Sequence, residues 1–101
     1  MYFTYKGYRL DSTRTASREL VHYGYGLYDV KHILEEGYDC SSSRRKANIR
    51  EKCIQLGNKE IKAVVALITP FYSDGYTETV WKLIHFGVIT YRRRKNETSG
   101  G

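Results

Sequence analysis

The chain has 101 residues, of which 41% are hydrophobic and 28% charged, and its formal net charge is +6. This length and composition limit it to one domain with one modest core. No apolar run approaches the roughly 18 residues that a membrane span needs, and the N-terminal sequence has no signal-peptide core. We therefore expect a cytoplasmic protein that makes no contact with a membrane.

The positive charge is concentrated in the second half of the chain. Residues 1–43 hold five Lys and Arg against six Asp and Glu, whereas residues 44–101 hold twelve against five. Most of the excess lies in two clusters, residues 44–46 and residues 92–95. Such clusters favour binding to phosphates, although solvated loops that only keep a protein soluble have the same composition.

The two cysteines, Cys40 and Cys53, form neither a CxxC pair nor a disulfide framework. They could meet in the fold, but structural disulfides are rare in chains without a secretion signal, so we do not expect this bond. His22 and His32 together with Cys40 match no common zinc-site spacing. We therefore expect no metal and no other cofactor.

The first half of the chain predicts an extended segment and two helices. Residues 2–8 alternate loosely, which indicates a short strand or an extended arm. Cap residues at 11–13, apolar spacing and a stop at Gly24 predict a helix of about three turns. A second helix is predicted from Leu27 to Gly37, where apolar residues again mark one face.

The second half predicts a loop and then a sheet. Residues 38–46 are polar, Ser-rich and basic, which is typical of a loop. Strands are predicted at 48–56, 61–69 and 77–91, with turns at 57–58 and 72–75 and a bend or bulge at Gly87. The expected fold is one α+β domain, residues 1–91, with two N-terminal helices packed on one face of a three- to four-stranded antiparallel sheet. Residues 92–101 have no apolar anchor and are expected to form a flexible basic tail.

Alternation along the last strand predicts which side chains enter the core. One parity contains Val80, Ile84, Phe86 and Val88, and we expect it to face the core. Lys82 has the same parity and would reach solvent from an edge. The opposite parity is expected to face outward or into a groove, and it comprises Trp81, Leu83, His85, Ile89 and Tyr91.

Three segments resemble a known family: LYDVKHILEEGYD (27–39), GNKEIKAVVALIT (57–69) and WKLIHFGVITYRRRK (81–95). They are similar to small domains of the RelE-like toxin superfamily, the barnase/EndoU/colicin/RelE group of metal-independent ribonucleases. Residues 26–27 and 29–30 match the corner between the helices, and residues 62–65 and 88–91 match the strands, so the resemblance covers about residues 13–93. Many relatives have a His in the first helix and an Arg before the corner Gly, whereas this chain has TRTASREL and Tyr25. The resemblance therefore implies either RNA cleavage by other residues or no activity.

Metal-independent RNA cleavage needs a base, an acid and cations for the phosphate. His85 is the candidate acid or base, because its reference pKa lies nearest neutrality. Tyr91 is a candidate acid or base-stacking residue, and Arg92 follows it at the strand end, where relatives place such residues. The candidate nucleic-acid-binding residues are Arg44, Arg45, Lys46, Arg50, Lys52, Lys62, Lys82 and Arg93, of which those on strands alternate with apolar residues and would form an exposed basic face.

Simpler interpretations remain open for these residues. His85 could be a hydrogen-bonded histidine in a second apolar layer. The tyrosines at 23, 25 and 28 could stack on bases, but such clusters more often cover a helix junction. Three functions follow: a toxin-like endoribonuclease acting on mRNA or ribosome-associated RNA, a non-catalytic nucleic-acid-binding module, and a partner of a small acidic antitoxin-like protein.

Overall fold

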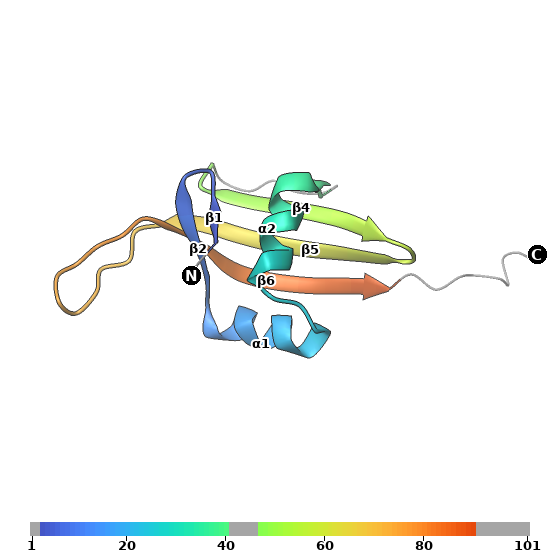
Figure 1. Cartoon of the computed structure of the whole chain (residues 1–101), viewed down its shortest axis with the longest axis horizontal. Helices are drawn as coiled ribbons and strands as arrows, with labels where there is room; N and C mark the ends of the chain where they lie inside the picture. The colour runs from blue at the N-terminus through green and yellow to red at the C-terminus, as the bar shows by residue number, and fades with distance from the viewer. Residues whose placement is uncertain (1–2, 41–46, 91–101) are drawn as a thin grey trace, which may run out of the picture.

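The computed structural model describes residues 3–40 and 47–90, and these residues form a six-stranded mixed sheet and two helices (Figure 1). Across the sheet the order is β1-β2-β6-β5-β4-β3, in which β2 and β6 are parallel and the other neighbours are antiparallel. In chain order the elements are β1 (Thr4–Tyr5), β2 (Tyr8–Ser12), α1 (Arg14–Tyr23), α2 (Leu27–Glu36), β3 (Tyr38–Asp39), β4 (Ile49–Leu56), β5 (Lys59–Ile68) and β6 (Val80–Thr90).

The expected fold, with two N-terminal helices on a three- to four-stranded antiparallel sheet, is wrong. The β1-β2 hairpin precedes the helices and joins the sheet through parallel pairing of β2 with β6. After the helices, β3 adds a two-residue strand to the far edge, where a loop was expected. The helices therefore lie between strands along the chain, and the sheet is wider than expected and mixed.

Both helices occupy the predicted residues because local signals fix their ends. The hydroxyl of Thr13 accepts a hydrogen bond from the N–H of Ala16 at 3.1 Å, which caps the start of α1. Gly24 ends this helix in the left-handed conformation, with φ of 81°. At the start of α2 the carboxylate of Asp29 accepts from the N–H of Gly26 at 2.9 Å.

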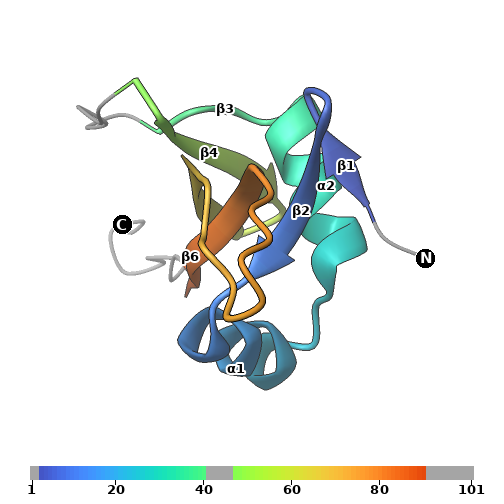
Figure 2. The same ribbon diagram turned by 90° about the vertical axis from the view of Figure 1, so that its left-hand side faces the viewer.

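The core lies between the helices and one face of the sheet, here called the inner face. It contains Leu20 of α1, Val30 of α2 and Val65 of β5, each at most 4% exposed. In Figure 2 the sheet curls around α2, which contacts β1 and β2 on one side and β4 and β5 on the other. The other helix, α1, packs against β6. This leaves the opposite face, here called the outer face, without a helix.

A β-bulge in β6 changes which side chains face the core. Leu83 pairs with Val65 and His85 pairs with Val64, so Ile84 has no opposite residue on β5. Trp81 and Leu83 before the bulge, like Phe86 and Val88 after it, therefore pack in or against the core. The prediction that Phe86 and Val88 face the core is confirmed. The predictions that Trp81 and Leu83 face outward and that Ile84 faces the core are wrong. The bulge lies at Ile84, three residues before the expected Gly87.

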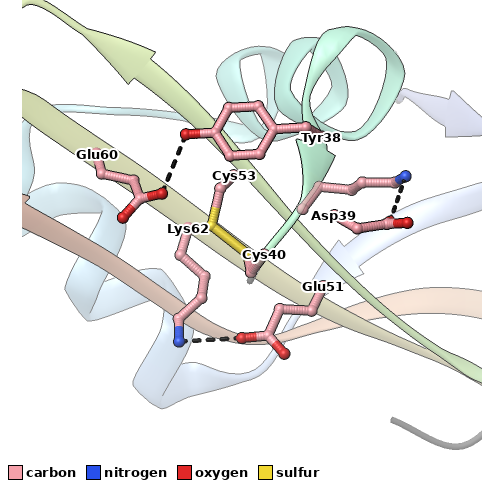
Figure 3. Close-up of a disulfide and its surroundings, with 8 residues drawn as sticks. Tyr38, Asp39, Cys40, Glu51, Cys53, Glu60 and Lys62 are labelled. Carbon is pink, nitrogen blue, oxygen red and sulfur yellow. Dashed lines mark hydrogen bonds and ion pairs between the residues drawn. A yellow bond between two sulfur atoms is a disulfide. The ribbon is translucent and has the colours of Figure 1, made fainter. Parts of the chain in front are cut away.

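A disulfide joins Cys40, which follows β3, to Cys53 of β4 (Figure 3). The structure thus differs from the expectation that these cysteines do not pair. Gly37 makes the approach possible, because a Cβ there would lie 2.4 Å from the carbonyl oxygen of Ile33 and 2.6 Å from that of Cys53. The end of α2 therefore rests directly on β4, and the chain continues alongside it to Cys40.

Candidate functional site

The sheet register divides the four predicted binding cations that lie on strands, Arg50, Lys52, Lys62 and Lys82, between the two faces. Residues that pair across a ladder share a face of the sheet. The ladder partners of Arg50 and Lys52 belong to the core cluster, so these two cations lie on the inner face at β4. Lys62 and Lys82 lie on the outer face, as does His85. The four cations therefore do not form the single basic face that the sequence predicts, and Lys62 and Lys82 are the two that lie on the same face as His85.

Three of these four predicted binding cations are ion-paired with carboxylates. Lys62 lies 3.0 Å from Glu51, whose side chain is only 6% exposed. Lys82 lies 3.2 Å from Asp11 on the neighbouring strand. Lys52 pairs with Asp39 of β3 at 2.8 Å. Each carboxylate cancels much of the attraction that its lysine would exert on a phosphate.

Two of these carboxylates have pKa values below their usual range, as expected for carboxylates that accept hydrogen bonds from a cation. A hydrogen bond from Lys52, together with its charge, lowers the pKa of Asp39. Burial alone would raise the pKa of Asp11, but hydrogen bonds from the Ser12 N–H and from Lys82 bring it below the ordinary value. Both lysines thus carry their charge within an ion pair, and each pair has no net charge.

Arg50 is a packing residue on the inner face. Its guanidinium lies 5.9 Å from the ring centroid of Trp81, which is 3% exposed, and it donates to the carbonyl oxygen of Ala47 at 2.9 Å. A cation held over an indole ring gains a cation–π contact, and its stem covers apolar surface. This arrangement turns Arg50 toward the core rather than toward an external ligand.

The whole net charge of the chain lies outside the described residues. Residues 3–40 and 47–90 hold ten Lys and Arg and ten Asp and Glu, so they are formally neutral. Residues 41–46 and 91–101 hold seven Lys and Arg and the single acid Glu97, which gives the full +6. Six of the candidate site residues fall in these segments and are not described by the structure: Arg44, Arg45, Lys46, Tyr91, Arg92 and Arg93.

His85 is the candidate catalytic residue that the structure does describe, and it lies beside a carboxylate from α1. Its side chain is 51% exposed, and its Nδ1 atom lies 3.6 Å from Oε2 of Glu19. The other oxygen of Glu19 accepts a hydrogen bond from the N–H of Phe86 at 2.8 Å, which fixes the carboxylate against β6. A carboxylate in this place favours the tautomer with the proton on Nδ1 and leaves Nε2 able to accept one.

Gly87 opens space next to the Nε2 atom of His85. A Cβ built at Gly87 would lie 3.3 Å from Nε2 and 4.0 Å from Cε1 of His85, and apart from Phe86 and Val88 no other residue comes within 4 Å. The ladder partner of Gly87 on β5 is Lys62, which shares the outer face with His85. The ammonium group of Lys62 is directed to Glu51 of β4, which lies 3.0 Å away, so the imidazole of His85 is the polar group that the structure places beside Gly87.

Glu19 and Gly87 were not identified as site residues from the sequence. Glu19 is an ordinary helix residue in sequence, and only the packing of α1 against β6 brings it to His85. Gly87 carried a signal, because an isolated glycine in a strand indicates a bend or a close approach. The sequence predicts a bend or bulge at Gly87, whereas in the structure this glycine leaves room beside the imidazole of His85.

The tyrosines around the helix corner mostly cover the helix junction. The rings of Tyr23 and Tyr25 lie 6.3 and 5.5 Å from the ring of Phe86 in the core. Tyr28 packs against Phe3 at 6.0 Å but keeps 67% of its surface exposed. The contacts of Tyr23 and Tyr25 agree with the packing interpretation.

Across residues 3–40 and 47–90, no three His, Cys, Asp or Glu side chains gather closely enough to hold a metal ion. In the same part of the chain, neither helix is long and apolar enough to cross a membrane. Comparison of the chain with protein-family models, with curated proteins and with solved structures finds no match. The resemblance to the RelE-like superfamily rests on the sequence motifs alone and stays a prediction.

Proposed function

We propose that this protein binds single-stranded RNA and cleaves it without a metal, with His85 as the general base and Glu19 as its positioning residue. The observation that carries the proposal is the pairing of the His85 Nδ1 atom with Glu19 at 3.6 Å, with Nε2 turned to the open space at Gly87. A carboxylate, an imidazole and an unobstructed acceptor nitrogen are the parts that base catalysis needs.

The proposed reaction uses the 2′-hydroxyl of the RNA as the nucleophile. Nε2 of His85 takes the hydroxyl proton while the 2′-oxygen attacks the neighbouring phosphorus atom. The bond from phosphorus to the 5′-oxygen breaks, which gives a 2′,3′-cyclic phosphate, and the leaving 5′-oxygen takes up a proton from an acid. Glu19 stabilises the imidazolium that forms.

The sequence supplies candidates for the remaining roles immediately after β6. Tyr91 as the acid and Arg92 as the phosphate-binding cation follow Thr90 directly in the chain. Both assignments stay predictions. Because the described residues are formally neutral, we assign most of the affinity for RNA to the two basic clusters, residues 44–46 and 92–95.

The test is cleavage of a defined single-stranded RNA in EDTA. We expect wild-type protein to cut it, His85→Ala to lose at least about tenfold in rate, and Glu19→Gln to lose about tenfold. His32→Ala is the matched control, because His32 is an exposed histidine on α2 that has no part in the proposal. Absence of cutting by the wild type, or full activity of His85→Ala, would overturn the proposal.

A second candidate, non-catalytic binding to RNA or DNA, is favoured by the pairing of Lys52, Lys62 and Lys82 with carboxylates. In that case the folded body only presents the two basic clusters, and affinity falls steeply with salt while no products form. Binding to a small acidic antitoxin-like protein would use the same clusters and likewise stays a prediction.

Cytoplasmic location also stays a prediction. Disulfides persist mainly in oxidising compartments, and the structure has a bond between Cys40 and Cys53. A test of location should therefore also measure whether this bond is formed in the cell.

A further inference from the structure

The connection between β5 and β6 is an ordered hairpin that projects from one end of the sheet (Figure 1). Phe71 and Thr77 form a β-bridge across it. The N–H of Tyr72 donates to the carbonyl of Tyr76 at 2.9 Å, and the N–H of Gly75 donates to the carbonyl of Tyr72 at 2.9 Å. Gly75 has φ of 87°, which the turn requires. The tip therefore has a defined shape.

The tip of this hairpin is aromatic and acidic. Phe71 is 78% exposed and Tyr76 is 56% exposed, and the ring of Tyr72 stacks on that of Tyr76 at 5.8 Å. Asp74 supplies the negative charge of the tip, and residues 69–79 contain no Lys or Arg. The other carboxylate of this segment, Glu78 at the base, is ion-paired with Arg9 of β2 at 2.9 Å. Large exposed aromatic side chains on a projecting, ordered element are typical of a contact surface.

The outward face of α1 has the complementary character. Val21 is 78% exposed and lines a shallow hollow of about 440 Å³ together with Arg14, Ser17, Arg18 and His22. The one carboxylate of this helix, Glu19, is turned to β6. This face therefore combines an apolar centre with two guanidinium groups.

We propose that these two surfaces bind each other between copies of the chain, with the hairpin tip of one copy in the α1 hollow of the next. Phe71 would cover Val21, and Asp74 would face Arg14 and Arg18. Guanidinium groups also bind well to aromatic rings. In Figure 1 the hairpin projects beyond the end of the sheet, whereas α1 lies below the sheet, so we place the contact between molecules.

Because the two surfaces differ, the association is head-to-tail. Each copy keeps one unused hairpin and one unused hollow at the ends of an assembly, so growth continues beyond a dimer unless a ring closes. RNA is a less suitable occupant of the hairpin tip, since Asp74 repels phosphates and residues 69–79 offer no cation. The inference does not depend on the proposed RNA cleavage.

Sedimentation velocity of the full chain over a wide concentration range tests this inference. The mean mass of the wild type should rise with concentration above that of the monomer, to a closed ring of two or more copies or to longer assemblies. Phe71→Ser and Val21→Glu change exposed side chains, so both should fold, and each alone should stay monomeric. A mixture of the two variants should form heterodimers and nothing larger, because each supplies the surface that the other has lost. Tyr28→Ser, which removes an exposed aromatic side chain from α2, should associate like the wild type.

Three results would overturn the inference: a wild type that is monomeric at every concentration, variants that associate like the wild type, or a mixture that stays monomeric. A further arm adds a single-stranded RNA of defined sequence. If the wild type is monomeric and Phe71→Ser weakens RNA binding, the hairpin is an RNA contact and the proposed self-association is wrong.

Discussion

Removing the disulfide between Cys40 and Cys53 should destabilise this protein strongly. The bond closes a loop with a sequence separation of 13 residues, which in the chain-entropy account removes about 10 cal/mol/K from the unfolded state, or about 3 kcal/mol at 25 °C. The bonded cysteines also hold β3, a strand of two residues, against β4. A strand this short has few ladder hydrogen bonds of its own, so it depends on the covalent link.

The expected change in melting temperature follows from the size of the chain. A domain of 101 residues has an unfolding entropy of about 210 cal/mol/K, so a loss of about 3 kcal/mol lowers the melting temperature by about 14 °C. Thermal unfolding followed by circular dichroism, with and without reductant, measures this shift. The variant Cys40→Ala is the control, because it should melt like the reduced wild type and should not respond to reductant.

Two results would refute this reasoning. One is a difference of less than about 4 °C between oxidised and reduced wild type, which would be only about a quarter of the expected entropic effect. The other is the finding of two free thiols by chemical titration of native protein prepared without reductant, because the bond would then be absent.

Four further predictions follow from single features of the structure. Gly37→Ala should lose about 1–3 kcal/mol of unfolding free energy in urea, because its Cβ would lie 2.4 Å from a backbone oxygen, and a wild-type value would contradict this contact. Gly87→Ala should keep its stability but slow RNA cleavage, because the methyl group would push against Nε2 of His85; unchanged rates would remove Gly87 from the site. Replacing residues 44–46 by Gln should reduce the slope of log affinity against log salt for single-stranded RNA by about 2, whereas replacing Lys6 and Arg9 should change it little. Because Asp11 has a lower pKa in the folded than in the unfolded chain, its contribution to stability is complete above its ordinary value of 3.8 and is lost as the pH falls further. Lys82→Met should make urea unfolding less sensitive to pH in that range, and an unchanged acid dependence would argue against the pair.

The helices, turns and main strands could be predicted because their signals are local. Gly24 and Gly37 mark the ends of the two helices, and the β-branched run at 61–68 indicates a buried strand. By contrast, β2 pairs with β6 at the other end of the chain, and β3 is only two residues long. Neither pairing leaves a periodic pattern, so the sheet was predicted too small and wholly antiparallel.

The candidate site was predicted less well than the fold, for two physical reasons. The bulge at Ile84 reverses the alternation that assigns faces, and this residue carries no sequence signal for a bulge. Charge clusters can be counted in a sequence, but the carboxylate that neutralises each lysine is found only when strands are aligned, as with Lys62 and Glu51. Likewise, α1 brings Glu19 to His85 from a distant part of the chain.

End-group analysis of the RNA products tests the central claim most directly. If His85 removes the 2′-hydroxyl proton, a defined single-stranded RNA incubated with wild-type protein in EDTA should give fragments with 2′,3′-cyclic phosphate ends and 5′-hydroxyl ends. The same preparation of His85→Ala should give at most about a tenth of these products. Products with 5′-phosphate ends, equal yields from both proteins, or intact RNA with the wild type would contradict the account.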